Sequence, residues 1–352
     1  MKKIVFVIPN MTGGGTERVI SLLSEQYIRM GYEVAIMQFA GYEHAYELPE
    51  QVEDFSIAAQ SHGNPLVWVK RLFDMRHYYK KNPDCYIFAF CVMGTVFSVI
   101  ATLGRKRHIL VAERSSPLSC NMPKLRNWAY RRVDKIAFQT ADGITYFPES
   151  IAKKAVIIPN AVAKDVPERY EGVRKKRIVS VGRLGKEKNH KLLLDAFAIF
   201  HEKMPEYELH IYGKGELEQA LKEQAKQLGV EQAVVWHGFS SNVKQEIVDS
   251  GMFVLPSNYE GISNSMVEAL GMGLPTIATD CPIGGARTYI EDGVNGLLVP
   301  VGDKEAMAAA MLRIAQDDEL AEQMSKNAAK IKEKYSMERI AGQFLEAAGI
   351  YE

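Results

Sequence analysis

Two carboxylates, Glu260 and Glu268, lie eight residues apart in the stretch NYEGISNSMVEALGMGLP. Glu260 stands among turn-forming residues after the apolar run MFVLP, whereas Glu268 lies inside a helical apolar pattern. If Ser263 or Asn264 caps that helix, the backbone amides of residues 262–265 are free to bind an anion. Carboxylates accept hydrogen bonds from vicinal hydroxyls. The spacing therefore predicts one long ligand, with a phosphate at the helix start and a carboxylate on each side. The alternative is a capping residue and a helix-surface acid.

Two cations follow another apolar run, RIVSV. The segment GRLGKEKNH places Arg183 and Lys188 around a turn before a helical pattern. Two cations that converge on a diphosphate each contribute about 1.5–3 kcal/mol through charged hydrogen bonds. The alternative is a solvated surface loop.

Glycine-rich turns follow three further apolar runs. Gly14 and Gly15 belong to GGGTER, Gly213 to IYGKGEL, and a glycine pair closes TDCPIGG. Glycine lets the backbone approach a ligand closely, and a helix start offers amides and partial positive charge. GGGTER is not the dinucleotide fingerprint, because Arg18 stands where the third glycine of G-x-G-x-x-G belongs.

The elements that must position these residues alternate strand and helix, twice over. The 352 residues exceed one ordinary core, so two domains are expected, joined by a polar linker near residues 164–176. Alternation of this kind predicts two doubly wound parallel sheets, in which ligands bind at the carboxyl ends of strands. The last forty residues are expected to be helical.

Composition sets limits on the class of protein. Four scattered cysteines without C-x-x-C spacing fit a reducing compartment and no zinc site. Residues 1–165 carry an excess of basic residues and residues 166–352 an equal acidic excess, which favours an anionic partner for the first half, such as a phosphate or a membrane surface. The alternative is random drift in solvated surface charge. The uncharged run from Cys85 to Gly104 has the length of a membrane span. Gly94-Thr95 divides it, so we expect a strand over 86–90 and a helix over 95–103.

Together, Glu260-x₇-Glu268, GRLxxEKN, IYGxG and GGGTERV resemble the retaining glycosyltransferases of family four. The resemblance covers nearly the whole chain and is strongest over residues 178–303. The chain is similar in particular to bacterial enzymes that build capsular, exopolysaccharide or lipid-linked glycans. It implies the GT-B fold: two Rossmann-like domains that face a central cleft, with the acceptor-side domain over 1–164, the nucleotide-sugar domain over 165–335, and a C-terminal helix over 336–352 that crosses back.

The resemblance also implies roles for single residues. Arg183 and Lys188 would bind and stabilise the leaving diphosphate, Glu260 would contact the donor sugar, and Glu268 would hold the ribose hydroxyls. Further donor contacts are expected from the residues of the surrounding loops: Gly14, Gly15, Gly213, Ile262, Ser263 and Asn264.

One place departs from the family pattern. Many relatives carry a histidine after the strand that matches ILVA, where this chain reads AERSSP, with Glu113, Arg114 and Ser115. Arg114 is therefore expected among the donor-binding residues, and none of the eight histidines is assigned to catalysis.

The implied reaction moves a sugar from a UDP-sugar to a glycan or polyprenyl-diphosphate-linked acceptor with retention, by same-face attack. No D-x-D cluster is present, so we expect no cofactor and no essential metal. We also expect no nucleic-acid partner.

Two other classes remain open. A nicotinamide-dependent oxidoreductase or epimerase lacks its fingerprint and its Y-x-x-x-K pair here, and a non-catalytic glycosyltransferase-like protein would bind a donor without turnover.

Two basic segments with aromatic residues, WVKRLFDMRHYYKK and PKLRNWAYRRVDK, lie in the first half. Basic helices with aromatic side chains bind anionic membranes. We therefore expect a cytoplasmic protein attached peripherally to the inner face of the cell membrane. The alternative is two ordinary amphipathic helices whose apolar faces pack on the first sheet.

Overall fold

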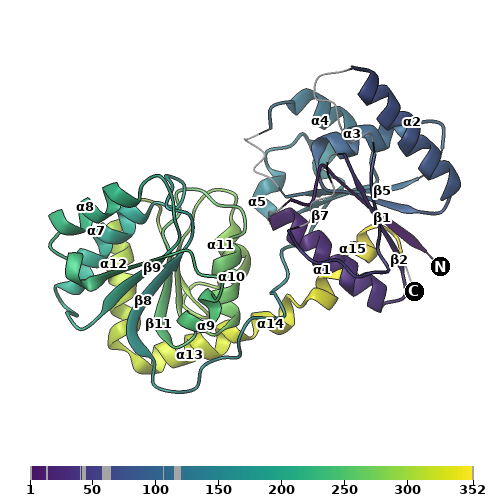
Figure 1. Ribbon diagram of the computed structural model, residues 1–352. Helices are drawn as coiled ribbons and strands as arrows, with labels where there is room; N and C mark the ends of the chain where they lie inside the picture. Colours follow the sequence, from purple (N-terminus) through teal and green to yellow (C-terminus); the bar gives the residue numbers. More distant parts are fainter. Residues whose placement is uncertain are drawn as a thin grey trace. The chain divides into compact units, whose positions relative to one another are not determined.

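The structure, a computed structural model, describes residues 2–12, 15–39, 41, 45–57, 65–105, 107–114 and 120–350. Two compact units make up the chain (Figure 1). Unit 1 comprises Met1–Asn160 and Met337–Glu352, and unit 2 comprises Ala161–Ser336. Each unit is a parallel sheet with helices on both faces.

In the part of unit 1 that is described, parallel strands form one sheet in the order β3-β2-β1-β4-β5-β6-β7. Their bounds are β1 (Lys3–Ile8), β2 (Glu33–Gln38), β3 (Glu53–Ser56), β4 (Tyr86–Ala89), β5 (His108–Glu113), β6 (Lys135–Phe138) and β7 (Ala155–Ile157). The inner strands are runs of Val, Ile, Leu and Phe, as expected where helices cover both faces. The strand order reverses between β1 and β4, so the sheet is doubly wound.

Helices cover both faces of this sheet. Figure 1 shows α1 and α15 on one face and α2, α3 and α4 on the other. The helices of unit 1 are α1 (Gly15–Arg29), α2 (Pro65–Lys81), α3 (Val92–Ala101), α4 (Pro123–Tyr130), α5 (Ala141–Ile144), α6 (Glu149–Ala152) and α15 (Met337–Ala347). Aromatic rings fill the first face: Phe6 stacks on Tyr27 at 6.1 Å, and Phe88 lies 6.1 Å from Phe344 of α15. The Tyr27 hydroxyl donates to the Ala341 carbonyl at 3.2 Å. The last helix is thus part of the core of unit 1.

The uncharged run of residues 85–104 forms β4 and α3. The helix begins at Val92, three residues before the predicted start, because the Cys91 thiol caps it by accepting a hydrogen bond from the Gly94 amide at 3.0 Å. None of the helices in the described ranges is both long and apolar enough to cross a membrane.

Unit 2 contains a parallel sheet in the order β10-β9-β8-β11-β12-β13. The strands are β8 (Lys175–Val181), β9 (Glu208–Tyr212), β10 (Val234–Gly238), β11 (Ser250–Leu255), β12 (Thr276–Thr279) and β13 (Leu297–Val299). The order reverses between β8 and β11. The loops after these two strands therefore flank the position where doubly wound sheets bind their ligands.

The helices of unit 2 divide between the two faces of its sheet. They are α7 (His190–His201), α8 (Glu218–Gln227), α9 (Val243–Ile247), α10 (Asn264–Gly271), α11 (Gly285–Tyr289), α12 (Lys304–Gln316), α13 (Asp318–Ala329) and α14 (Ile331–Lys334), with a short 3-10 turn η2 (Glu231–Ala233). Figure 1 shows α7, α8 and α12 on one face and α10 and α11 on the other. Buried Leu193, Phe197 and Met311 belong to the core under α7 and α12.

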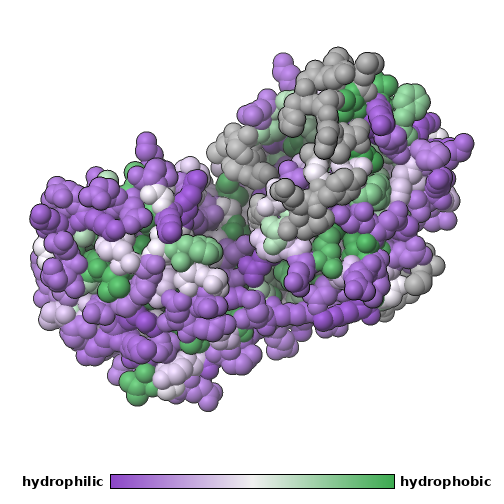
Figure 2. All heavy atoms as spheres, viewed as in Figure 1, coloured by the Kyte–Doolittle hydropathy of each residue, from purple (hydrophilic) through white to green (hydrophobic). Residues whose placement is uncertain are grey.

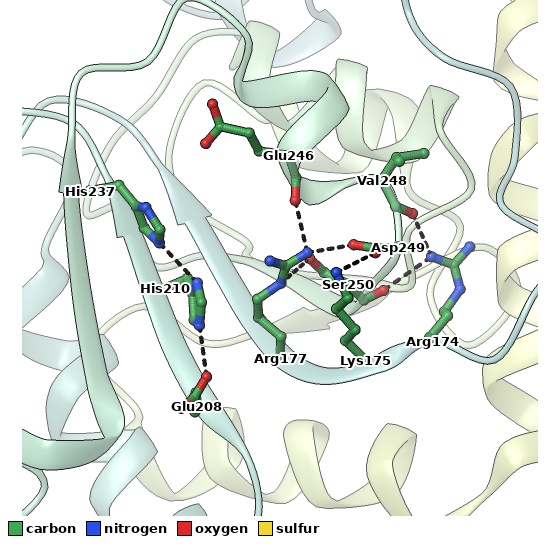
Figure 3. A network of polar contacts seen from close by, with 10 residues as sticks. All are labelled: Arg174, Lys175, Arg177, Glu208, His210, His237, Glu246, Val248, Asp249 and Ser250. Carbon is green, nitrogen blue, oxygen red and sulfur yellow. Dashed lines mark hydrogen bonds and ion pairs between the residues drawn. The ribbon is translucent and has the colours of Figure 1, made fainter.

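The polar segment expected as a linker is bound along unit 2. Arg174 donates hydrogen bonds to the carbonyls of Val248 and Ser250, both at 3.0 Å (Figure 3). Arg177, two residues into β8, donates to the Ser250 hydroxyl at 2.8 Å and pairs with Asp249. The two arginines thus bind the oxygen atoms of residues 248–250, between the end of α9 and the start of β11. These bonds fix the polar segment to unit 2.

The two basic segments with aromatic residues differ from each other. In α4, the side chains of Arg126 and Tyr130 are buried, and the Tyr130 hydroxyl donates to Glu113 at 2.7 Å. Tyr130 therefore belongs to the core of unit 1 and does not contact a membrane, as the alternative interpretation of this segment expects. In α2, by contrast, Val69 and Phe73 are exposed. Figure 2 shows hydrophobic and hydrophilic side chains side by side over this helix.

Candidate functional site

The loop between β8 and α7, residues 182–189, is held rigidly. Asn189 adopts a left-handed conformation (φ 47°), which Asn tolerates better than most residues, and its side chain caps α7 by accepting from the Leu192 amide at 3.3 Å. Its Nδ2 donates to Asn258 at 2.8 Å, and Asn258 donates to the Lys186 carbonyl at 3.0 Å. These bonds clamp the loop after β8 to the loop after β11. Neither asparagine was predicted to join the two loops.

Lys188 and Glu260 form an ion pair across these two loops. The side chains are 16% and 21% exposed, so both charges are largely shielded from water. The pair lies where the strand order reverses, between the ends of β8 and β11. Two of the three predicted catalytic residues are thus in direct contact at the position where such sheets bind ligands.

Arg183, the third predicted catalytic residue, pairs with Glu187 of its own loop at 2.6 Å. The Arg183 side chain is 67% exposed. Burial of Glu187 opposes its ionisation, but hydrogen bonds from its backbone and from Arg183 outweigh this and lower the pKa of Glu187. Glu187 therefore keeps its charge and holds the guanidinium at the mouth of the loop. In the sequence, only the acidic residue within GKEKNH indicates that Arg183 has an ion-pair partner in its own loop.

Two glycines allow close backbone contacts between neighbouring loops. Gly213 has φ 140°, and a Cβ there would lie 1.9 Å from the carbonyl oxygen of Gly182. A Cβ on Gly285 would lie 1.5 Å from the carbonyl oxygen of Gly261. Nearby, Ile283 adopts φ 79°, which is rare for a β-branched residue, and such strain concentrates at functional loops. The glycines of IYGKG and PIGG thus serve loop packing.

A cavity of about 640 Å³ opens at the carboxyl ends of β8, β9 and β10. Its lining includes Arg183, Tyr212, Gly213 and Phe239. The Phe239 side chain is 76% exposed, so one aromatic face is available for stacking. Its position after β10 was not recognised, because HGF reads as an ordinary strand end in the sequence.

The start of α10 lies beside these loops. Ser263 is the residue before the helix and is buried, and its hydroxyl lies 3.1 Å from that of Ser265. The Ser265 hydroxyl donates to the Val181 carbonyl at 2.9 Å, which joins the helix start to the end of β8. Ser263 occupies the N-cap position, one of the two alternatives expected, but its side chain makes no capping hydrogen bond. Glu268 lies half-buried within α10, as its spacing predicts.

The other predicted donor-binding residues are distributed over both units. Ile262 is buried and Asn264 begins α10, both in unit 2. Gly15 begins α1 and Arg114 follows β5, both in unit 1. The Arg114 guanidinium donates to the side chain of Asn160. Gly14 and Ser115 lie outside the described residues.

His190, next to the ion pair of Lys188, was assigned no role from the sequence. Its ring is buried, and neither ring nitrogen has a hydrogen-bond partner among the described residues. Burial, followed by the nearby Lys188 charge, lowers the pKa of His190 to about 4. A neutral imidazole at this position adds no charge that would compete with Lys188.

Comparison with known proteins relates this architecture to a family. Residues 164–331 match the family model described as "Glycosyl transferases group 1". The chain is 28% identical to an uncharacterized glycosyltransferase of Haemophilus influenzae over 97% of this chain and 98% of that protein. It is 27% identical, over 95% of both proteins, to the N-acetylgalactosamine-N,N'-diacetylbacillosaminyl-diphospho-undecaprenol 4-alpha-N-acetylgalactosaminyltransferase of Campylobacter jejuni.

Solved structures show the same fold. Anabaena Alr3699/HepE in complex with UDP has a TM-score of 0.82 at 20% identity, over 99% of this chain and 100% of that one. These relationships indicate a glycosyltransferase. The chain therefore has the GT-B fold, and its residues 164–331 resemble the glycosyl transferases group 1 family.

Proposed function

We propose that this protein is a retaining glycosyltransferase of family four that moves a sugar from a UDP-sugar to a glycan or polyprenyl-diphosphate-linked acceptor in bacterial surface polysaccharide synthesis. The observation that carries the proposal is the Lys188–Glu260 pair at the reversal point of the unit 2 sheet, beside the cavity of about 640 Å³. A cation, a carboxylate and an aromatic cavity together match the three parts of a nucleotide sugar: diphosphate, sugar and base.

Each part of the donor has a proposed partner. The base stacks on Phe239 in the cavity, where base–aromatic stacking is worth about 1–3 kcal/mol. Lys188, Arg183 and the first amides of α10 stabilise the charge that develops on the leaving diphosphate. Glu260 accepts hydrogen bonds from the sugar, and Glu268 from the ribose.

The proposed reaction needs no protein nucleophile. The acceptor hydroxyl attacks the anomeric carbon from the face that the diphosphate leaves, the carbon–oxygen bond to the diphosphate breaks, and a diphosphate oxygen takes the hydroxyl proton. The alpha linkage in the name of the Campylobacter jejuni relative is the one that retention would produce from an alpha-linked donor. Because Lys188 and Arg183 supply the positive charge, we propose that no metal is required.

A nucleotide-sugar screen followed by a transfer assay tests this function. Thermal shift with UDP-glucose, UDP-galactose and their N-acetylated forms identifies the donor, because a ligand that binds the native state raises its melting temperature. Nucleotide release that depends on a polyprenyl-diphosphate-linked acceptor, and that persists in EDTA, supports the proposal. An inverted anomer in the product, seen by NMR, contradicts retention. Binding without release indicates a non-catalytic protein.

We also propose that the protein works at the cytoplasmic face of the membrane, attached through α2. Phe73, 69% exposed, and Val69 lie one turn apart, and Lys70, Lys80 and Lys81 are exposed on the same helix. Apolar side chains with lysines around them complement the acyl and headgroup layers of an anionic bilayer. Such an attachment brings the enzyme to a lipid-linked acceptor.

A further inference from the structure

Three neighbouring strands of unit 1 are followed by polar side chains that meet. Arg114 comes directly after β5, Gln139 directly after β6, and Asn160 three residues after β7. The three strands are adjacent in the sheet. Because their carboxyl ends lie at one edge, residues far apart in the sequence come into contact there.

The Asn160 side-chain oxygen is shared by two donors. It accepts one hydrogen bond from Nη2 of Arg114 and another from Nε2 of Gln139 at 2.8 Å. Asn160 is only 6% exposed, and the chain before it is anchored by the Ile158 amide, which donates to Phe138 at 2.8 Å. Gln139 thus fixes which way the Asn160 amide faces, and Asn160 in turn faces the guanidinium.

The chemistry of this contact is specific. A hydrogen bond from a guanidinium to an amide oxygen is charge-assisted, so it restrains the arginine strongly. The amide carries no net charge, so this bond does not cancel the charge of Arg114. A carboxylate in the place of Asn160 would hold the guanidinium at least as firmly but would oppose its attraction for an anionic ligand.

We propose that Asn160, oriented by Gln139, is a positioning residue that holds Arg114 ready to bind the donor. The inference rests on the proposed function and on the expectation from the sequence that Arg114 is one of the residues that bind the donor. It extends that function to two residues of unit 1 that do not themselves touch the donor. Arg114 binds through its positive charge, and Asn160 sets the direction in which this charge is presented.

The isosteric substitution Asn160→Asp separates positioning from charge. The carboxylate still accepts from Arg114, so we expect the melting temperature to stay the same or rise. The added negative charge should raise the KM for the UDP-sugar at least about tenfold. Asn160→Ala should also raise this KM, by about tenfold, because the guanidinium loses its restraint. A merely structural asparagine would show losses of stability and of activity together.

A double-mutant cycle then shows whether Asn160 acts through Arg114. In an Arg114→Ala background, adding Asn160→Ala should not raise the donor KM further, because the group that it positions is gone. Additive effects, or an Asn160→Asp variant with an unchanged donor KM, overturn the proposal. Gln139→Ala should weaken donor binding less than Asn160→Ala and should also have no effect in the Arg114→Ala background.

Asn127→Asp is the matched control. Asn127 accepts a hydrogen bond from Arg126 at 3.3 Å in the same unit, so the substitution puts the same charge beside another arginine. It should leave the donor KM unchanged. Calorimetric binding of UDP and of the UDP-sugar is measured in parallel. If Arg114→Ala binds and transfers normally, the positioning proposal fails while the glycosyltransferase stands. If the wild-type protein binds no UDP-sugar, both fail.

Discussion

Lys188 and Glu260 form an ion pair, so replacing either residue removes the ion-pair partner of the other. Lys188→Ala should lower turnover at least about tenfold, which corresponds to roughly 1.4 kcal/mol of transition-state stabilisation. Arg183→Ala should have an effect of the same order, because Arg183 is also proposed to bind the diphosphate. Turnover at saturating donor is the measurement, with circular dichroism to verify the fold. Near-wild-type rates in both variants would remove the diphosphate role.

The two glutamates should differ in which kinetic constant they change. Glu260→Gln should lower kcat, because Glu260 pairs with Lys188 and its proposed partner is the reacting sugar. Glu268→Gln should mainly raise the donor KM, because its proposed partner is the ribose. Steady-state kinetics over a range of donor concentrations separates the two. If both variants change only the melting temperature, the pair is structural.

His190 makes stability depend on pH. Its pKa is about 4 in the folded protein against an ordinary 6.5, so between these values the unfolded chain binds the proton and the folded protein does not. The contribution of His190 to the free energy of unfolding is therefore fully present above pH 6.5. It is lost as the pH falls towards 4, and the loss is on the order of 3 kcal/mol. His190→Leu should flatten this part of the profile in urea unfolding at pH 7.5 and 5. Equal losses in both proteins would contradict the assignment.

At the scale of elements, the turn after β9 requires glycine at position 213, because there is no room for a side chain. Gly213→Ala would place a Cβ against the Gly182 carbonyl in a conformation that only glycine adopts readily. We expect a loss of about 1–3 kcal/mol in stability together with weaker donor binding, because the cavity is lined by both loops. Gly342→Ala in α15 is the control: nothing lies within 4 Å of its added Cβ. It should stabilise the protein by about 0.5–1 kcal/mol.

The alternation of elements was predictable because buried parallel strands read as unbroken apolar runs. The strand β3 was not predicted, since EDFS at the edge of a sheet has neither an apolar run nor a turn signal. The start of α3 was misplaced because a cysteine cap is an unusual signal. In each case the missing information lies in tertiary contacts.

The site was predictable in the same uneven way. Their charge and their place in loops after strands made Lys188, Arg183 and Glu260 candidates individually. That Lys188 pairs with Glu260, 72 residues away, follows only from the strand order that brings β8 beside β11. Phe239 and Asn160 were missed because aromatic and amide side chains at strand ends are common and their partners come from other loops.

At the scale of the whole molecule, the exposed face of α2 should govern membrane binding. Reversing Lys80 and Lys81 to Glu should reduce binding to anionic liposomes more than about tenfold, since each basic residue near the surface contributes about 1 kcal/mol. Phe73→Ser should weaken binding by removing apolar contact. Sedimentation at low and high salt measures both effects.

The control for this experiment is Lys226→Glu, a charge reversal at an exposed position of α8 in unit 2. It should leave liposome binding unchanged. Pelleting of the wild-type protein that is equal with neutral and anionic lipid, or absent with both, would rule out the electrostatic contact.

The return of α15 to unit 1 has a consequence for how the protein is made. Synthesis on the ribosome proceeds from the N-terminus, and most domains fold in that order. Here the ring of Phe344 and the carbonyl that binds Tyr27 arrive only after all of unit 2 has been translated. The unit that begins first is therefore completed last. A premature stop codon anywhere in unit 2 would also remove α15, which covers part of the core of unit 1.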